Sequence, residues 1–156
     1  MEKVITEFFE EQSFTYSKNH SEDGNTYFTM GIQNKDNIYH IVFEYDFEEK
    51  YFAITAVNSR KLSSKYRKKV LKIYNNFAQG QSPVVHIFTQ HGMVASKYNY
   101  ELVEEKLTKK RIDFMLSTVL TDVSQMYIYL KKAVKKSKKL DKKQNIKGKD
   151  VRNQIK

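Results

Sequence analysis

The apolar residues of the N-terminal third change their spacing near residue 26. Before that point they lie three and four positions apart, at Val4, Ile5, Phe8 and Phe9, with glutamates between them. Such spacing predicts an amphipathic helix of about three turns. Beyond a turn that contains Gly24, apolar and polar residues alternate, which predicts β-strands.

The alternating region predicts three strands, at residues 27–32, 38–47 and 51–57. The second strand has the clearest pattern, because every other residue is large and apolar: Tyr39, Ile41, Phe43, Tyr45 and Phe47. Its opposite face is mostly polar and should contact solvent; it carries His40, Val42, Glu44 and Asp46. Links of only a few residues join the three strands, which favours an antiparallel meander.

The second half of the chain predicts two helices and a hairpin. The first of these helices covers residues 65–79 and ends at Gly80, and the hairpin pairs residues 84–89 with residues 93–100. The last helix begins after Thr108 and keeps one apolar face for about seven turns. The predicted order is α-βββ-α-ββ-α, an α+β fold in which helices pack on a mainly antiparallel sheet.

The composition of the chain excludes several kinds of chemical site. With 156 residues the chain has the size of one domain, and the absence of cysteine excludes disulfides, thiolate nucleophiles and cysteine-based zinc sites. The first residues do not resemble a signal peptide, and no apolar run is long enough to cross a membrane. We therefore expect a cytoplasmic protein without a transmembrane segment.

The net charge of +10 is concentrated near the C-terminus. Residues 131–156 hold 12 of the 28 Lys and Arg side chains but only two of the 18 Asp and Glu side chains, so residues 1–130 are neutral. We therefore expect a single α+β domain at residues 1–136. A flexible, lysine-rich tail should follow at residues 137–156, and it should be irregular beyond Gly148.

This basic region and the start of the mid-chain helix are candidate polyanion-binding segments. Lysine supplies positive charge without reading bases, so nucleic-acid binding through them would be non-specific and salt-dependent. A solubilising tail and a contact for an acidic protein are the alternatives. The candidate residues are Lys131, Lys132, Lys135, Lys136, Lys138, Lys139, Lys142 and Lys143, together with Arg67, Lys68 and Lys69 from a basic cluster at residues 60–72.

No residue pattern indicates catalysis, a cofactor or a metal site. His86 and His91 are close in sequence, yet no cysteine or acidic residue completes a metal site with them. Glu44 and Asp46 share a strand face, but further glutamates follow them, and a solvated acidic edge is the simpler interpretation. We therefore predict a protein that is not an enzyme and needs no cofactor.

Four segments carry a family resemblance: the opening VITEFFEEQSFTYS, the mid-chain helix YRKKVLKIYNNFAQ, the hairpin VVHIFTQHGMVASKY and the closing LTKKRI. In these segments and in element order, residues 2–136 resemble the YbjN-like proteins and the fold of type III secretion chaperones. The resemblance implies a non-enzymatic α+β domain that forms a homodimer and presents a surface to protein segments. Asn75 and Asn76, in the mid-chain helix, are either contacts to a neighbouring strand or partner, or surface amides. The basic tail departs from the family pattern.

The sequence thus predicts a macromolecule-binding protein. The leading hypothesis is a chaperone-like or adaptor domain with a protein partner. The alternative is a nucleic-acid-associated protein, in which the tail and the cluster at residues 60–72 form one positive surface for DNA or RNA. An exposed, Tyr-rich apolar patch on the sheet or on the closing helix would favour the protein partner.

Overall fold

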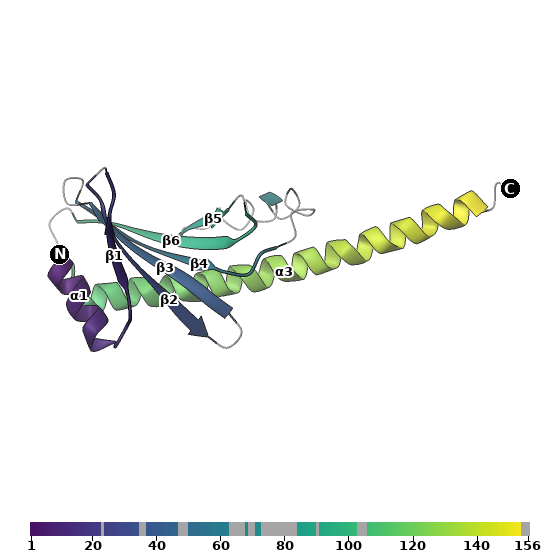
Figure 1. The fold of residues 1–156 in the computed structure, drawn as a ribbon. Coiled ribbons are helices and arrows are strands. Elements are labelled where there is room, and N and C mark those ends of the chain that lie inside the picture. Colours follow the sequence, from purple (N-terminus) through teal and green to yellow (C-terminus); the bar gives the residue numbers. More distant parts are fainter. Residues whose placement is uncertain are drawn as a thin grey trace.

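The structure, a computed structural model, describes residues 1–22, 24–34, 37–46, 50–62, 68, 71–72, 84–89, 91–102 and 106–153, with side chains as far as Lys139. Six strands form one sheet, and two helices with defined bounds pack on it (Figure 1). In chain order the elements are α1 (Glu2–Glu11), β1 (Ser17–His20), β2 (Thr26–Asn34), β3 (Asn37–Asp46), β4 (Tyr51–Asn58), β5 (Val84–Phe88), β6 (Val94–Glu101) and α3 (Lys109–Asn153).

The strands lie side by side in the order β1-β2-β3-β4-β6-β5, and all neighbouring pairs are antiparallel. Both helices pack on the same face of the sheet, and the hydrophobic core lies between them and that face (Figure 1). The alternation of β3 is confirmed, because Ile41 and Phe43 are completely buried whereas His40 is exposed. We call the helix-covered face the core face and the other the open face.

Aromatic rings hold α1 against the sheet. The ring of Phe9, on α1, is completely buried. Its centroid lies 4.7 Å from that of Tyr16 and 4.9 Å from that of Phe43. Phe28 of β2 lies next to it, at 5.6 Å, in an edge-on arrangement. Tilted and edge-on contacts of this kind are the favoured geometries for aromatic pairs, so the rings fix the position of α1 on the core face.

Helix α3 begins where the sequence predicts it. The Arg111 backbone N–H donates to Thr108 Oγ1 at 3.2 Å, which satisfies one of the free N–H groups at the helix start. The predicted apolar face is buried: Ile112, Met115, Leu116, Val119, Val123, Met126, Tyr127, Leu130 and Val134. Beyond this packed part, α3 projects well past the sheet (Figure 1).

The α+β class and the antiparallel sheet are confirmed, and the sheet has one strand more than the five in the predicted order. Ser17–His20 forms an additional strand, β1, which pairs with the first half of β2. All four of its side chains are exposed. A polar edge strand buries neither face, so it leaves no alternation in the sequence from which it could be predicted.

Two further differences concern the helices. The predicted mid-chain helix, residues 65–79, lies outside the described residues except for Lys68, Leu71 and Lys72, which are helical. The tail was predicted to be irregular beyond Gly148, yet the backbone is helical through Asn153 as part of α3. A helix that starts on a packed segment extends without a new nucleation step, which an isolated lysine-rich segment would need. The division into a domain and a tail stays a prediction.

Candidate functional site

Helix α3 carries large apolar side chains on its solvent side. Phe114 is 54% exposed, Ile128 51% and Tyr129 45%. About four helical turns separate Phe114 from Ile128, so the two lie along the same side of α3, and Tyr129 adjoins Ile128. Residues of this size are usually buried, and when several lie exposed on one surface they indicate a contact site.

Lysines continue this surface towards the C-terminus. All six from 131 to 139 are exposed: Lys131, Lys132, Lys135, Lys136, Lys138 and Lys139. They recur at three- and four-residue intervals, which places them on one side of α3, while Val134 is buried on the other. We call Phe114, Ile128, Tyr129 and these six lysines the α3 outer surface. Lys142 and Lys143 belong to the same helix, in the part described by its backbone alone.

The second group of predicted polyanion-binding residues is described only in part. Lys68 is helical and exposed, whereas Arg67 and Lys69 lie outside the described residues. The predicted common surface of the tail and the cluster at residues 60–72 therefore stays a prediction. Asn75 and Asn76 also lie outside the described residues.

His86 belongs to a polar cluster between the sheet and α3. Its side chain is 5% exposed, and its Nδ1 lies 2.9 Å from Asp122 Oδ2 and 3.4 Å from Ser96 Oγ. Ser96 donates its hydroxyl to the same Asp122 oxygen at 2.7 Å. One carboxylate of α3 thus bonds side chains of β5 and β6. The Ser96 hydroxyl is completely buried and directed at a carboxylate, which is not the arrangement that activates a serine nucleophile.

The sequence contains a signal for this cluster, although the cluster was not among the predicted sites. His86 alternates with Val84 and Phe88, so the period of the strand places all three on the core face. Asp122 immediately precedes Val123, within the apolar pattern of α3. A histidine and an acid at core-facing positions of two predicted elements would have indicated a buried pair.

Replacing Asp122 with alanine should lower the free energy of unfolding by about 1–3 kcal/mol, because the buried side chains of His86 and Ser96 would lose their acceptor. Urea denaturation followed by circular dichroism measures this change. The matched control is Asp113→Ala, which removes an exposed carboxylate from the same helix and should cost less than about 0.5 kcal/mol. Equal stability of the two variants would contradict the structural role of the cluster.

The remaining candidate groups have different surroundings. His91 is exposed in the turn between β5 and β6, so it does not share the buried environment of His86. Glu44 Oε2 pairs with Lys97 Nζ at 3.0 Å, across the intervening strand β4, which gives this carboxylate a cation as its neighbour. Among the described residues, no three His, Cys, Asp or Glu side chains are grouped so that they could hold a metal ion.

The ion pair on the open face changes the proton affinity of its lysine. Burial acts to lower the pKa of Lys97, but hydrogen bonds and charge interactions with Tyr51 and Glu44 outweigh it and raise the pKa above its usual 10.5. A lysine whose pKa is raised by folding stabilises the folded state, and this contribution is fully present when the pH is below the pKa of the unfolded state. That contribution is lost as the pH rises through the folded-state pKa.

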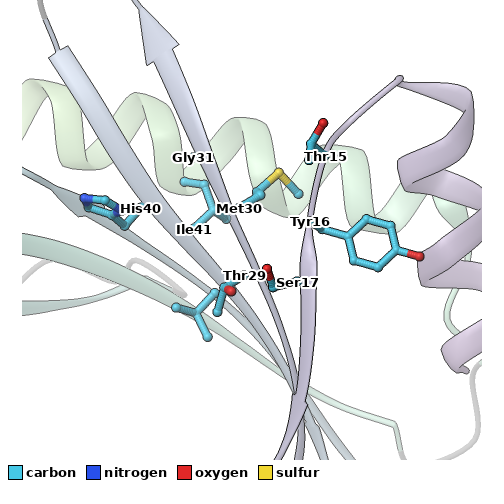
Figure 2. A pocket seen from close by; sticks show the side chains of 9 residues that line it. Thr15, Tyr16, Ser17, Thr29, Met30, Gly31, His40 and Ile41 are labelled. Carbon is cyan, nitrogen blue, oxygen red and sulfur yellow. The ribbon is translucent and has the colours of Figure 1, made fainter.

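A hollow of about 400 Å³ lies where β1 separates from β2. Its lining residues are Thr15, Tyr16, Ser17, Thr29, Met30, Gly31, His40, Ile41 and Val42. The Met30 side chain points from β2 into the space beside Thr15 and Ser17 (Figure 2). Nothing lies within 4 Å of the position that a Cβ atom would take at Gly31, so the open face of the sheet is uncovered there.

Comparison with known proteins assigns no family: no family model and no curated protein matches the chain. The resemblance to YbjN-like proteins and type III secretion chaperones therefore stays a prediction. Within the part of the chain that the structure describes, no helix is long and apolar enough to span a membrane.

Proposed function

We propose that this chain is a non-catalytic, macromolecule-binding protein of the chaperone-like or adaptor kind, and that the α3 outer surface binds an acidic, partly apolar segment of another protein. The observation that carries the proposal is the exposure of Phe114, Ile128 and Tyr129 on one solvent-facing side of a helix that continues into exposed lysines. The apolar side chains are complementary to apolar groups on a partner, and the lysines are complementary to acidic groups.

The apolar part of the surface supplies affinity. Burying an exposed side chain such as Ile128 removes apolar area from water, at about 25 cal/mol per Å². Tyr129 adds a rigid ring with a polar end, a residue type enriched where proteins meet. Phe114 extends the same side of α3 by about four turns, so a helical or extended partner segment would contact both ends of the surface.

The lysines supply attraction and orientation. Exposed positive charges speed the association with an acidic partner, and salt weakens this attraction by screening it. The lysines therefore favour an acidic partner without defining its sequence. A partner held by apolar contacts next to the lysines should therefore stay bound at moderate salt, whereas one held by the lysines alone should dissociate.

The double variant Ile128→Ser, Tyr129→Ser should lose its protein partner while keeping its fold, because both side chains are about half exposed. Affinity capture from nuclease-treated lysate, wild type beside variant, measures the loss. The matched control is Val85→Ser, which removes a side chain of equal exposure (51%) from β5. Retention of the same protein by the double variant would contradict the proposed role of α3.

A second candidate function is non-specific binding of DNA or RNA. It is favoured by the exposure of all six lysines from 131 to 139 and by the projection of α3 beyond the sheet, which leaves room for a bulky polyanion (Figure 1). Binding of this kind would be held by phosphate contacts, so it should be indifferent to sequence and fall steeply with salt.

A further inference from the structure

The outer half of β2 is an edge without a neighbouring strand. Strand β1 pairs with Thr26 to Thr29 and ends there, at the pair of Ser17 with Thr29. Residues 30–34 of β2 continue along β3 and have no strand on their other side among the described residues. The hollow of Figure 2 lies at the point where this free edge begins.

The hydrogen-bonding groups of this edge can be assigned from the neighbouring pairs. The Ser21 backbone N–H donates to Asn25 O at 2.9 Å, so the odd-numbered residues of β2 direct their backbone groups towards β1. The same period continues through the free half. The N–H and C=O groups of Gly31 and Gln33 therefore point away from β3, along the open edge.

This edge lacks the features that normally prevent an edge strand from pairing with a strand of another molecule. Residues 30–34 contain no charged residue and no proline, and Gly31 leaves the backbone uncovered. Strand β1 is short and carries Lys18, which bonds Glu2 of α1.

The same end of the sheet has unfilled space and an unsatisfied polar atom. On the core face, a hollow of about 220 Å³ is lined by Ile32 and Tyr39 of the sheet and by Leu120 of α3. At Asn37, paired with Asn34, the side-chain Oδ1 is buried and has no hydrogen-bond partner in the described structure. The hollow leaves room on the core face next to Ile32.

We propose that this segment is residues 30–34 of a second copy of the chain, paired antiparallel about a two-fold axis at Ile32. This interface is independent of the partner that the α3 outer surface binds. In this pairing Gly31 exchanges backbone hydrogen bonds with Gln33 of the second copy, and the reverse exchange follows from the symmetry.

The segment is complementary to itself. Because residues 30–34 are uncharged, antiparallel self-pairing brings no like charges together. The two Ile32 side chains meet on the core face beside the hollow at Leu120. On the open face, each Gln33 side chain lies over the bare Gly31 of the other copy, where nothing occupies the space of a Cβ atom. With five residues on each side the interface is small, so dissociation should occur on the order of micromolar concentrations.

The experiment uses the absence of cysteine from the chain. In the proposed register, Ile32 faces Ile32 of the second copy at a non-hydrogen-bonded pair, where the two Cα atoms lie about 4.5 Å apart, within disulfide range. The variant Ile32→Cys should therefore form a disulfide-linked dimer under mild oxidation. The control Val85→Cys, exposed on the other edge strand, should remain mostly monomeric.

Sedimentation velocity over a concentration series tests the same interface without a covalent bond. The wild type should dimerise, and Ile32→Lys should dissociate the dimer, because it places two positive charges directly opposite each other. Gly31→Pro, which removes an edge N–H, should do the same while preserving the folded circular dichroism spectrum. Val85→Lys is the control and should dimerise like the wild type. A wild type that is monomeric throughout, or a dimer unaffected by both edge variants, would overturn the proposal.

Discussion

Replacing Phe9 with alanine should reduce the free energy of unfolding by about 3–5 kcal/mol, the largest effect expected from any single change considered for this chain. The side chain is completely buried, and its ring contacts those of Tyr16, Phe28 and Phe43. Alanine would leave a cavity at the point where α1 meets the sheet. It would also remove several aromatic contacts at once.

Urea denaturation gives the size of the effect through the shift in the transition midpoint. Phe114→Ala is the matched control, because it deletes the same ring from a position that is 54% exposed, and it should cost less than about 1 kcal/mol. Similar losses in both variants would mean that α1 does not pack on the sheet as described.

Changing Lys135, Lys136, Lys138 and Lys139 to glutamine should have the second-largest effect, on any affinity for nucleic acid. If about six lysines reach duplex phosphates, the logarithm of the binding constant falls against the logarithm of salt concentration with a slope near −5. Removing four of those charges should flatten the slope by roughly 3 to 4 units. The reason is that each neutralised phosphate releases condensed counterions.

Fluorescence anisotropy with a labelled duplex at several salt concentrations measures both slopes. The control variant changes four exposed lysines outside α3's basic part and the cluster at residues 60–72, Lys3, Lys50, Lys106 and Lys110, to glutamine, so it has the same net charge as the test variant. Its slope should match that of the wild type. Absence of binding at low salt would eliminate the nucleic-acid function. An unchanged slope in the test variant would assign the contact to other basic residues.

The parts of the fold that bury one face could be predicted from the sequence. In β3 large apolar residues recur at every second position, at Tyr39, Ile41 and Phe43, because that face packs against α1 and α3. The start of α3 was also predictable, since Thr108 combines a capping side chain with an apolar helical period directly after it. In both cases burial or capping constrains the residue type, so the pattern is visible in the sequence.

The remaining features depend on contacts between distant segments. Nothing in Ser17–His20 requires a strand until β2 offers its edge, and the cluster of His86, Ser96 and Asp122 exists only once β5, β6 and α3 have packed. For the candidate site, the sequence pointed to the lysines, six of which are exposed, but gave no weight to Ile128 and Tyr129. Both interrupt the buried period of α3, and only the packed helix shows that they face solvent.

Site-specific photo-crosslinking tests the central claim, that α3 binds a protein, most directly. A photoreactive amino acid replaces Ile128 in one variant and Val85, which is equally exposed on β5, in the other. After irradiation and nuclease treatment, we expect a discrete protein adduct from position 128 that is absent from position 85. Adducts that consist of nucleic acid, or protein adducts of equal yield from both positions, would contradict protein binding by α3.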